Sequence, residues 1–100
     1  MYKLEMTLKE ISMAKRRRQT LLRRLASVGP MMRGTIVTNG RKHPQPYFSV
    51  NKDKRTHLMY LGERRLPAAK KLVDNYKKLV LIVEELTMIN MALLKNDAIE

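Results

Sequence analysis

The carboxy-terminal third of the chain carries a long apolar stripe with helical spacing. Residues 66–95 contain no glycine, and their one proline, Pro67, suits the first position of a helix. The spacings along the stripe alternate between three and four, which is typical of a coiled coil. We therefore predict a long helix over 66–95 whose stripe joins two copies of the chain, with a polar residue, Asn90, fixing the register. The predicted oligomerisation residues are Leu72, Tyr76, Leu79, Val83, Leu86, Asn90 and Leu93.

The same stripe is also compatible with a monomer. Further apolar residues widen it beyond the seam of a two-stranded coiled coil, namely Val73, Val80, Leu81, Ile82 and Leu94. A wide apolar face is typical of a helix that packs on a sheet or on another helix of its own chain. We expect a homodimer, with the monomer as the alternative.

Residues 3–28 are predicted to form a first helix. They contain no glycine or proline, and the stop signal Gly29-Pro30 follows them. Lys15 and Arg18 interrupt the apolar stripe of this helix, within a run of four basic residues. The expected stripe consists of Leu4, Leu8, Ile11, Leu22 and Leu25.

Strand patterns fill the middle segment, residues 31–65. The run 35–38 is β-branched and ends at Asn39-Gly40, a turn signal. Two prolines lie in 41–46, so we expect a loop there.

Residues 47–50 and 55–61 are expected to pair as a hairpin around the turn 51–54. With a symmetric register, one face would carry Arg55, His57, Met59, Tyr47 and Ser49. The other would pack on the long helix through Thr56, Leu58, Tyr60, Phe48 and Val50. The expected fold class is α+β, with an N-terminal helix, a three-stranded antiparallel sheet and a long C-terminal helix in one domain over 1–100.

The net charge of +12 is unevenly distributed along the chain. Twenty-one Lys and Arg stand against nine Asp and Glu, and residues 3–28 and 29–66 carry +6 each while 67–100 carry none. Such segregation favours a polyanionic partner for the first two segments and an assembly role for the last helix.

Arginine and lysine side chains can grip phosphates along a helix edge or around a sheet, and an exposed tyrosine can stack on a base. A small sheet can also enter the DNA major groove. The predicted nucleic-acid-binding residues are Lys9, Lys15, Arg16, Arg17, Arg18, Arg23, Arg24, Arg33, Arg41, Lys42, Tyr47, Lys52, Lys54, Arg55 and His57.

No catalytic constellation stands out in the sequence. The absence of cysteine excludes disulfides, thiolate nucleophiles and Cys-ligated zinc. Neither His43 nor His57 has an acidic partner in sequence, and Glu84-Glu85 point to different sides of a helix. No phosphate-binding loop occurs. We expect no catalytic site, no metal and no cofactor.

The longest all-apolar run, Leu79–Val83, is far shorter than the roughly 18 residues of a membrane span. The first residues also lack the apolar core of a signal peptide. We expect a cytoplasmic protein without a membrane partner.

Four short motifs resemble a family of small basic bacterial proteins that are often found with mobile elements. They are 29–37 (GPMMRGTIV), 46–49 (PYFS), 54–56 (KRT) and 75–79 (NYKKL). Members of that family carry a cysteine-rich loop between the first two strands, whereas residues 39–45 contain no cysteine here, so a metal role does not carry over. The element order is also similar to the arm-site-binding domains of phage-type integrases, in which a three-stranded sheet reads DNA. Both resemblances imply DNA and mobile elements.

The expected function is therefore non-catalytic nucleic-acid binding, with double-stranded DNA ahead of RNA, as an accessory or regulatory factor of a phage or mobile element. The alternative is an interaction factor or inhibitor that docks on an acidic surface of a host nuclease or another protein. A coiled-coil adaptor is the third interpretation.

Overall fold

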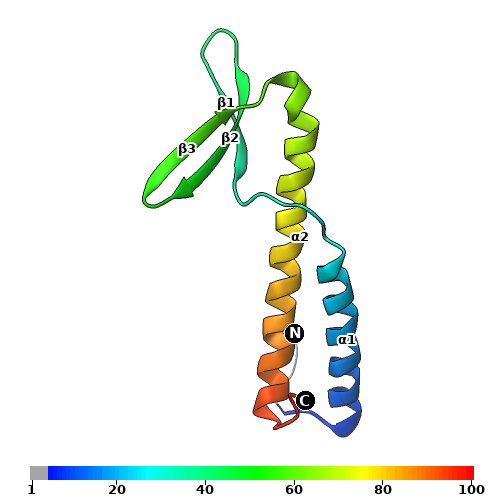
Figure 1. Ribbon diagram of the computed structural model, residues 1–100. Helices are drawn as coiled ribbons and strands as arrows, with labels where there is room; N and C mark the ends of the chain where they lie inside the picture. The colour runs from blue at the N-terminus through cyan, green and yellow to red at the C-terminus, as the bar shows by residue number, and fades with distance from the viewer. Residues whose placement is uncertain (1–4) are drawn as a thin grey trace. The chain divides into compact units, whose positions relative to one another are not determined.

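The computed structural model describes residues 5–100. Its elements follow one another as α1 (Leu8–Ala26), β1 (Thr35–Asn39), β2 (Gln45–Lys52), β3 (Arg55–Tyr60) and α2 (Gly62–Lys95) (Figure 1). The strands form one antiparallel sheet, which confirms the predicted α+β class and the order of its elements. The chain divides into two compact units: unit 1 comprises Met1–Val28 and Lys78–Glu100, and unit 2 comprises Gly29–Lys77.

Helix α1 starts later than the sequence predicted. Thr7 caps the helix by accepting the backbone N–H of Glu10, and the Glu10 carboxylate accepts the backbone N–H of Thr7 in return. This reciprocal capping box satisfies donors that the first turn leaves free, so the helix begins at Leu8. Residues 5–7 precede it without helical structure, and residues 3 and 4, Leu4 included, lie outside the described part of the chain.

The apolar stripe predicted for α1 was wrong in part: Ile11 packs against the core of unit 1 and Leu25 is half-buried, but two of its leucines are exposed. Leu8 is 87% exposed and Leu22 is also exposed, whereas Ala14 and Leu21 are buried against Ile89 and Leu93 of α2 in the core of unit 1. The buried side of α1 therefore runs through a small residue, Ala14, which a stripe of large apolar side chains does not include.

Helix α2 begins at Gly62, four residues before the predicted range 66–95 and five before Pro67. Pro67 lies inside the helix, where its missing N–H removes the bond to the carbonyl of Glu63. Only one turn of the helix precedes the proline, so the missing hydrogen bond affects only the start of α2. Gly62 takes a φ of +69°, and a Cβ there would lie 3.3 Å from the Tyr60 ring, so glycine suits the junction between β3 and α2.

The sheet of unit 2 has the order β1-β2-β3 and is tighter at its hairpin than predicted. Pairing between β2 and β3 continues to Lys52 opposite Arg55, which leaves a two-residue turn. Both turn residues, Asp53 and Lys54, have positive φ angles of 53° and 63°. This is the pattern of a type I′ hairpin turn.

The register places the hairpin side chains differently from the symmetric expectation. Tyr47 lies opposite Tyr60, and Phe48 lies opposite Met59. Directly opposed residues share a face, so each residue of β3 changes partners relative to the prediction. The outer face of the sheet carries Thr35, Val37, Asn39, Gln45, Tyr47, Ser49, Asn51, Thr56, Leu58 and Tyr60. The other face carries Ile36, Phe48, Val50, Lys52, Arg55, His57 and Met59.

Residues 41–46, predicted to be loop, end inside β2. Pro46 pairs with Thr38 of β1, and its carbonyl accepts the backbone N–H of Leu61 at 3.1 Å. Pairing with β3 begins only at Tyr47, so the missing N–H of Pro46 interrupts no ladder on that side.

The core of unit 2 lies between the sheet and the first half of α2. Phe48, Leu61, Ala69 and Val73 are buried there, with Met32, Ile36, Val50 and Leu66 packed around them. The amide of Asn75 donates to the carbonyl of Pro30 at 2.8 Å, which ties the incoming chain to α2.

Candidate nucleic-acid interface

The predicted basic residues divide between the two units, and the excess charge is larger in unit 2. Gly29–Lys77 hold eleven Lys and Arg against three Asp and Glu, a net charge of +8. The two segments of unit 1 hold ten against six, a net charge of +4. Unit 2 is therefore the stronger attractor of a polyanion.

Two arginines of the basic run in α1 have partners inside unit 1. The Arg17 guanidinium forms a two-pronged ion pair with Glu85 of α2, with nitrogen–oxygen distances of 2.6 and 2.9 Å. Arg18 donates to Asn90 Oδ1 at 3.2 Å and to the carbonyl of Ile99 at 2.6 Å. These contacts join α1 to α2 and the following segment, so both side chains act in the fold of unit 1.

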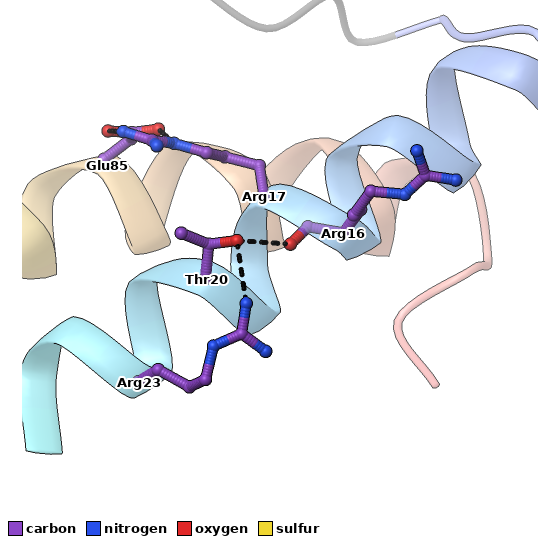
Figure 2. A network of polar contacts seen from close by, with 5 residues as sticks. All are labelled: Arg16, Arg17, Thr20, Arg23 and Glu85. Atoms are coloured by element: carbon purple, nitrogen blue, oxygen red, sulfur yellow. Dashed lines mark hydrogen bonds and ion pairs between the residues drawn. The ribbon is translucent and has the colours of Figure 1, made fainter.

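The remaining basic residues of α1 extend outward. Lys9, Arg16 and Arg23 are exposed, seven residues apart on one edge of the helix. Figure 2 shows Thr20 between two of them: its hydroxyl donates to the carbonyl of Arg16 and accepts from the guanidinium of Arg23. Arg16 itself extends away from Glu85. We call Lys9, Arg16 and Arg23 the α1 edge; Lys15, half-buried, lies on another side of the helix.

A cleft of about 450 Å³ lies between the end of α1 and α2 within unit 1. Arg24 lines it together with Lys78, and the apolar part of its wall includes Leu21, Leu81 and Ile82. Neither of these cations forms an ion pair with the residues that the structure describes. The predicted binding residue Arg24 thus faces a hollow rather than the α1 edge.

The hairpin tip of unit 2 is a projecting two-stranded ribbon. β1 pairs with β2 only up to Ser49, whereas β3 pairs with β2 to Lys52, so the ribbon extends past the edge of β1 (Figure 1). Every residue from 51 to 60 is exposed. The tip, residues 50–57, presents four of the predicted binding residues: Lys52, Lys54, Arg55 and His57.

Further cations surround the tip and the opposite end of the sheet. Arg33 donates to the carbonyl of Asn51 at 2.9 Å, which places its guanidinium beside the tip. Arg41 and Lys42 are exposed in the loop between β1 and β2. Sequence reasoning missed Arg64 and Arg65. Because α2 starts earlier than predicted, both lie in its first turn, where they are exposed.

Tyr47 forms an aromatic pair on the outer face of the sheet. Its ring meets that of Tyr60 edge to face, with centroids 5.5 Å apart and planes at 71°. The Tyr60 hydroxyl donates to Gln45 Oε1 at 3.3 Å. Sequence reasoning named Tyr47 as a base-stacking residue and missed Tyr60, because the symmetric register had turned it toward the core.

Several predicted oligomerisation residues are used within the units. Leu93 has no exposed surface, Leu86 packs against the same core, and Asn90 accepts a hydrogen bond from Arg18. Val83 is exposed, whereas the others are half-buried: Leu72, Tyr76 and Leu79. The last part of the stripe thus packs in the core of unit 1. The monomer alternative assigns this role to it.

Residues 5–100 contain no group of three or more His, Asp or Glu side chains arranged to hold a metal ion. In the same residues, neither helix combines the length and apolar character that crossing a bilayer requires. Comparison with protein-family models, curated proteins and solved structures found no match to this chain.

Proposed function

We propose that the protein is a non-catalytic nucleic-acid-binding protein that prefers double-stranded DNA. The observation that carries this proposal is the charge of unit 2, +8, with the cations of the hairpin tip exposed and unpaired among the described residues. Exposed like charges repel one another in the free protein, and a polyanion relieves that repulsion.

The shape of the tip favours a duplex groove. A two-stranded ribbon fits the major groove of B-DNA, which is about 12 Å wide. Lys52, Lys54 and Arg55 would then lie at the groove walls, where the phosphates are. A-form RNA has a deep and narrow major groove that side chains do not reach, so we place RNA second.

Unit 1 offers a second basic surface, the α1 edge. Its cations repeat every seven residues, about 10.5 Å along the helix. We propose that Lys9, Arg16 and Arg23 add phosphate contacts that carry no sequence information. In the cytoplasm, such a protein would act as an accessory or regulatory factor on the DNA of a mobile element.

For the homodimer, we propose a seam on the exposed side of α2 in unit 1. Val80, Val83, Met91 and Leu94 are all exposed and share one side of the helix by their spacing. Sedimentation at micromolar concentration tests this proposal. A single monomeric species would remove it.

A titration of a blunt DNA duplex across salt concentrations tests the proposed function. With about five phosphate contacts, log K should fall with a slope of about −4.5 against log salt. Binding that does not respond to salt would contradict the proposal. A stoichiometric host protein in place of nucleic acid in the purified fraction would favour the alternative, an acidic protein partner.

A further inference from the structure

We infer that the outer face of the unit 2 sheet binds an unpaired nucleobase by stacking it on Tyr47 or Tyr60. This inference rests on the proposed function and names a substrate class for it: DNA that contains a single-stranded segment. It starts from a contrast in unit 2, where the outer face is uncharged and partly aromatic although the unit as a whole is strongly basic.

The ten residues of the outer face include no Lys, Arg, Asp or Glu. Large apolar and aromatic side chains remain exposed on it, since Leu58 is 52% and Tyr60 is 49% accessible. Cations lie beyond both ends of the face, at the tip and in the β1–β2 loop. This is the composition of a single-strand binding platform, in which rings take the bases and surrounding cations take the backbone.

The ring of Tyr60 is held in place before any ligand arrives. The hydroxyl of Tyr60 is fixed on Gln45, and the backbone of Gly62 lies close beside its ring. A ring that is already ordered loses little conformational entropy when a base packs on it. Because the two rings stand at 71° to each other, only one of them can lie flat against a given base. We therefore expect one stacked base at this position.

Base pairing decides which nucleic acid can use this platform. In a duplex, neighbouring pairs cover the faces of each base, and only the edges reach the grooves. Away from the ends of a duplex, a tyrosine ring can stack only on a base that is unpaired or turned out of the helix. The platform also lies about 17 Å along the ribbon from Lys52, at five residues of strand rise, so it is separate from the tip.

A second copy of this chain is a poor occupant of the face. It would bring another unit of charge +8 against the first, and the two like charges would repel each other. A strand of nucleic acid brings the opposite charge together with planar rings. Charge complementarity thus favours the nucleic acid.

The first experiment leaves the protein unchanged and alters the bases. Fluorescence anisotropy compares an oligothymidylate with an abasic strand of the same length, which keeps every phosphate and lacks the bases. We expect the abasic strand to bind about 5- to 150-fold more weakly, the range for one lost stack. Equal affinity for the two strands would overturn the inference.

The second experiment removes the rings. Tyr47→Leu and Tyr60→Leu should include one variant that weakens oligothymidylate binding within the same range, while the salt slope and the affinity for a blunt duplex stay unchanged. The matched control Tyr47→Phe keeps the ring and should bind oligothymidylate like the wild type. Tyr60→Phe also keeps its ring but loses the hydrogen bond to Gln45, so its affinity should lie between that of the wild type and that of Tyr60→Leu. Duplex and single strand losing affinity together would indicate a structural effect and contradict the inference.

The two proposals fail in different ways. Salt-dependent binding with no difference between thymidine and abasic strands would leave the proposed function standing and remove the base platform. The absence of binding to every nucleic acid would remove both. The chain has no tryptophan, so quenching of tyrosine fluorescence by oligothymidylate, and not by the abasic strand, gives an independent signal of stacking in the wild-type protein.

Discussion

The two units use the same basic residue types for different purposes. In unit 1, Arg17 and Arg18 turn toward α2 and the segment after it, where a carboxylate, an amide and a carbonyl receive them. In unit 2, Lys52, Lys54 and Arg55 project from the hairpin with no acidic partner among the described residues. A run of arginines in sequence therefore does not define a binding surface, because partners from a distant segment can bind part of it.

The difference follows from where the acidic residues fall. Glu84, Glu85, Asp97 and Glu100 all belong to unit 1, whereas unit 2 has three acidic residues for eleven basic ones. One of those three, Asp53, occupies the hairpin turn itself. Acidic residues of unit 1 can thus neutralise part of its positive charge. In unit 2 most of the positive charge has no acidic residue of the same unit to neutralise it.

The largest expected effect concerns the core of unit 1. Leu93→Ala should lower the free energy of unfolding by about 2–5 kcal/mol, because Leu93 is fully buried and its removal leaves a cavity. The matched control is its neighbour, Leu94→Ala, at a position that is 63% exposed and should cost about 0.5 kcal/mol or less. Urea denaturation measures both. Equal losses would contradict the packing described for α1 and α2.

Unit 2 should be sensitive at a glycine. A Cβ on Gly34 would lie 2.5 Å from the Phe48 ring and from the carbonyl oxygen of Ser49, so Gly34→Ala should cost about 1–3 kcal/mol. At Gly29 the nearest atom would be 3.8 Å away, so Gly29→Ala carries only the strain of its positive φ, about 1 kcal/mol. Thermal unfolding of the two variants ranks them. If Gly34→Ala were more stable than Gly29→Ala, the close approach of Gly34 to Phe48 and Ser49 would be contradicted.

Removing one arginine from each unit contrasts their roles directly. Arg17→Met should lower stability by about 1 kcal/mol, or roughly 4–8 °C in Tm, because it breaks a half-buried two-pronged ion pair. Arg55→Met removes a cation without a partner and should leave Tm within about 2 °C. Glu85→Gln should reproduce much of the Arg17→Met loss, and the double variant should cost less than the sum of the two. Additive losses would mean that the pair contributes nothing.

The smallest effect lies in the hairpin turn. Lys54→Gly should raise stability by about 0.5 kcal/mol, since glycine adopts the positive φ of this position without strain but loses more entropy on folding. The same change removes one cation from the tip, so the salt slope for duplex DNA should become less steep by about 0.9. Stability and affinity would then move in opposite directions. A variant that gains both would exclude Lys54 from the phosphate contacts.

The order of elements was predictable because each has a strong local signal. The glycine and proline positions separated the helices from the sheet, and the hairpin followed from the alternation around residues 51–54. Boundaries were less accessible. Thr7 and Glu10 have the spacing of a capping box, which marks the start of α1, whereas the early start of α2 depends on Pro67 being tolerated one turn after the helix begins.

The sequence alone did not determine which side chains share a face of the sheet or which arginines of α1 are exposed, because both depend on contacts between distant residues. A tight two-residue turn changed the partner of every β3 residue, which moved Tyr60 to the outer face and placed Arg55 and His57 on the other. The partners of Arg17 and Arg18 lie 68 to 81 residues away in sequence. No local sequence pattern indicates which arginines of a basic run will form hydrogen bonds or ion pairs with such distant partners.

The hairpin tip allows the most direct test of the contrast between the two units. The measurement is the salt dependence of duplex binding for the wild type and for the triple variant Lys52→Gln, Lys54→Gln and Arg55→Gln. If all three cations contact phosphates, the slope of log K against log salt should become less steep by about 2.7, with the fold intact by circular dichroism. An unchanged slope would show that the exposed charge of unit 2 does not serve nucleic-acid binding.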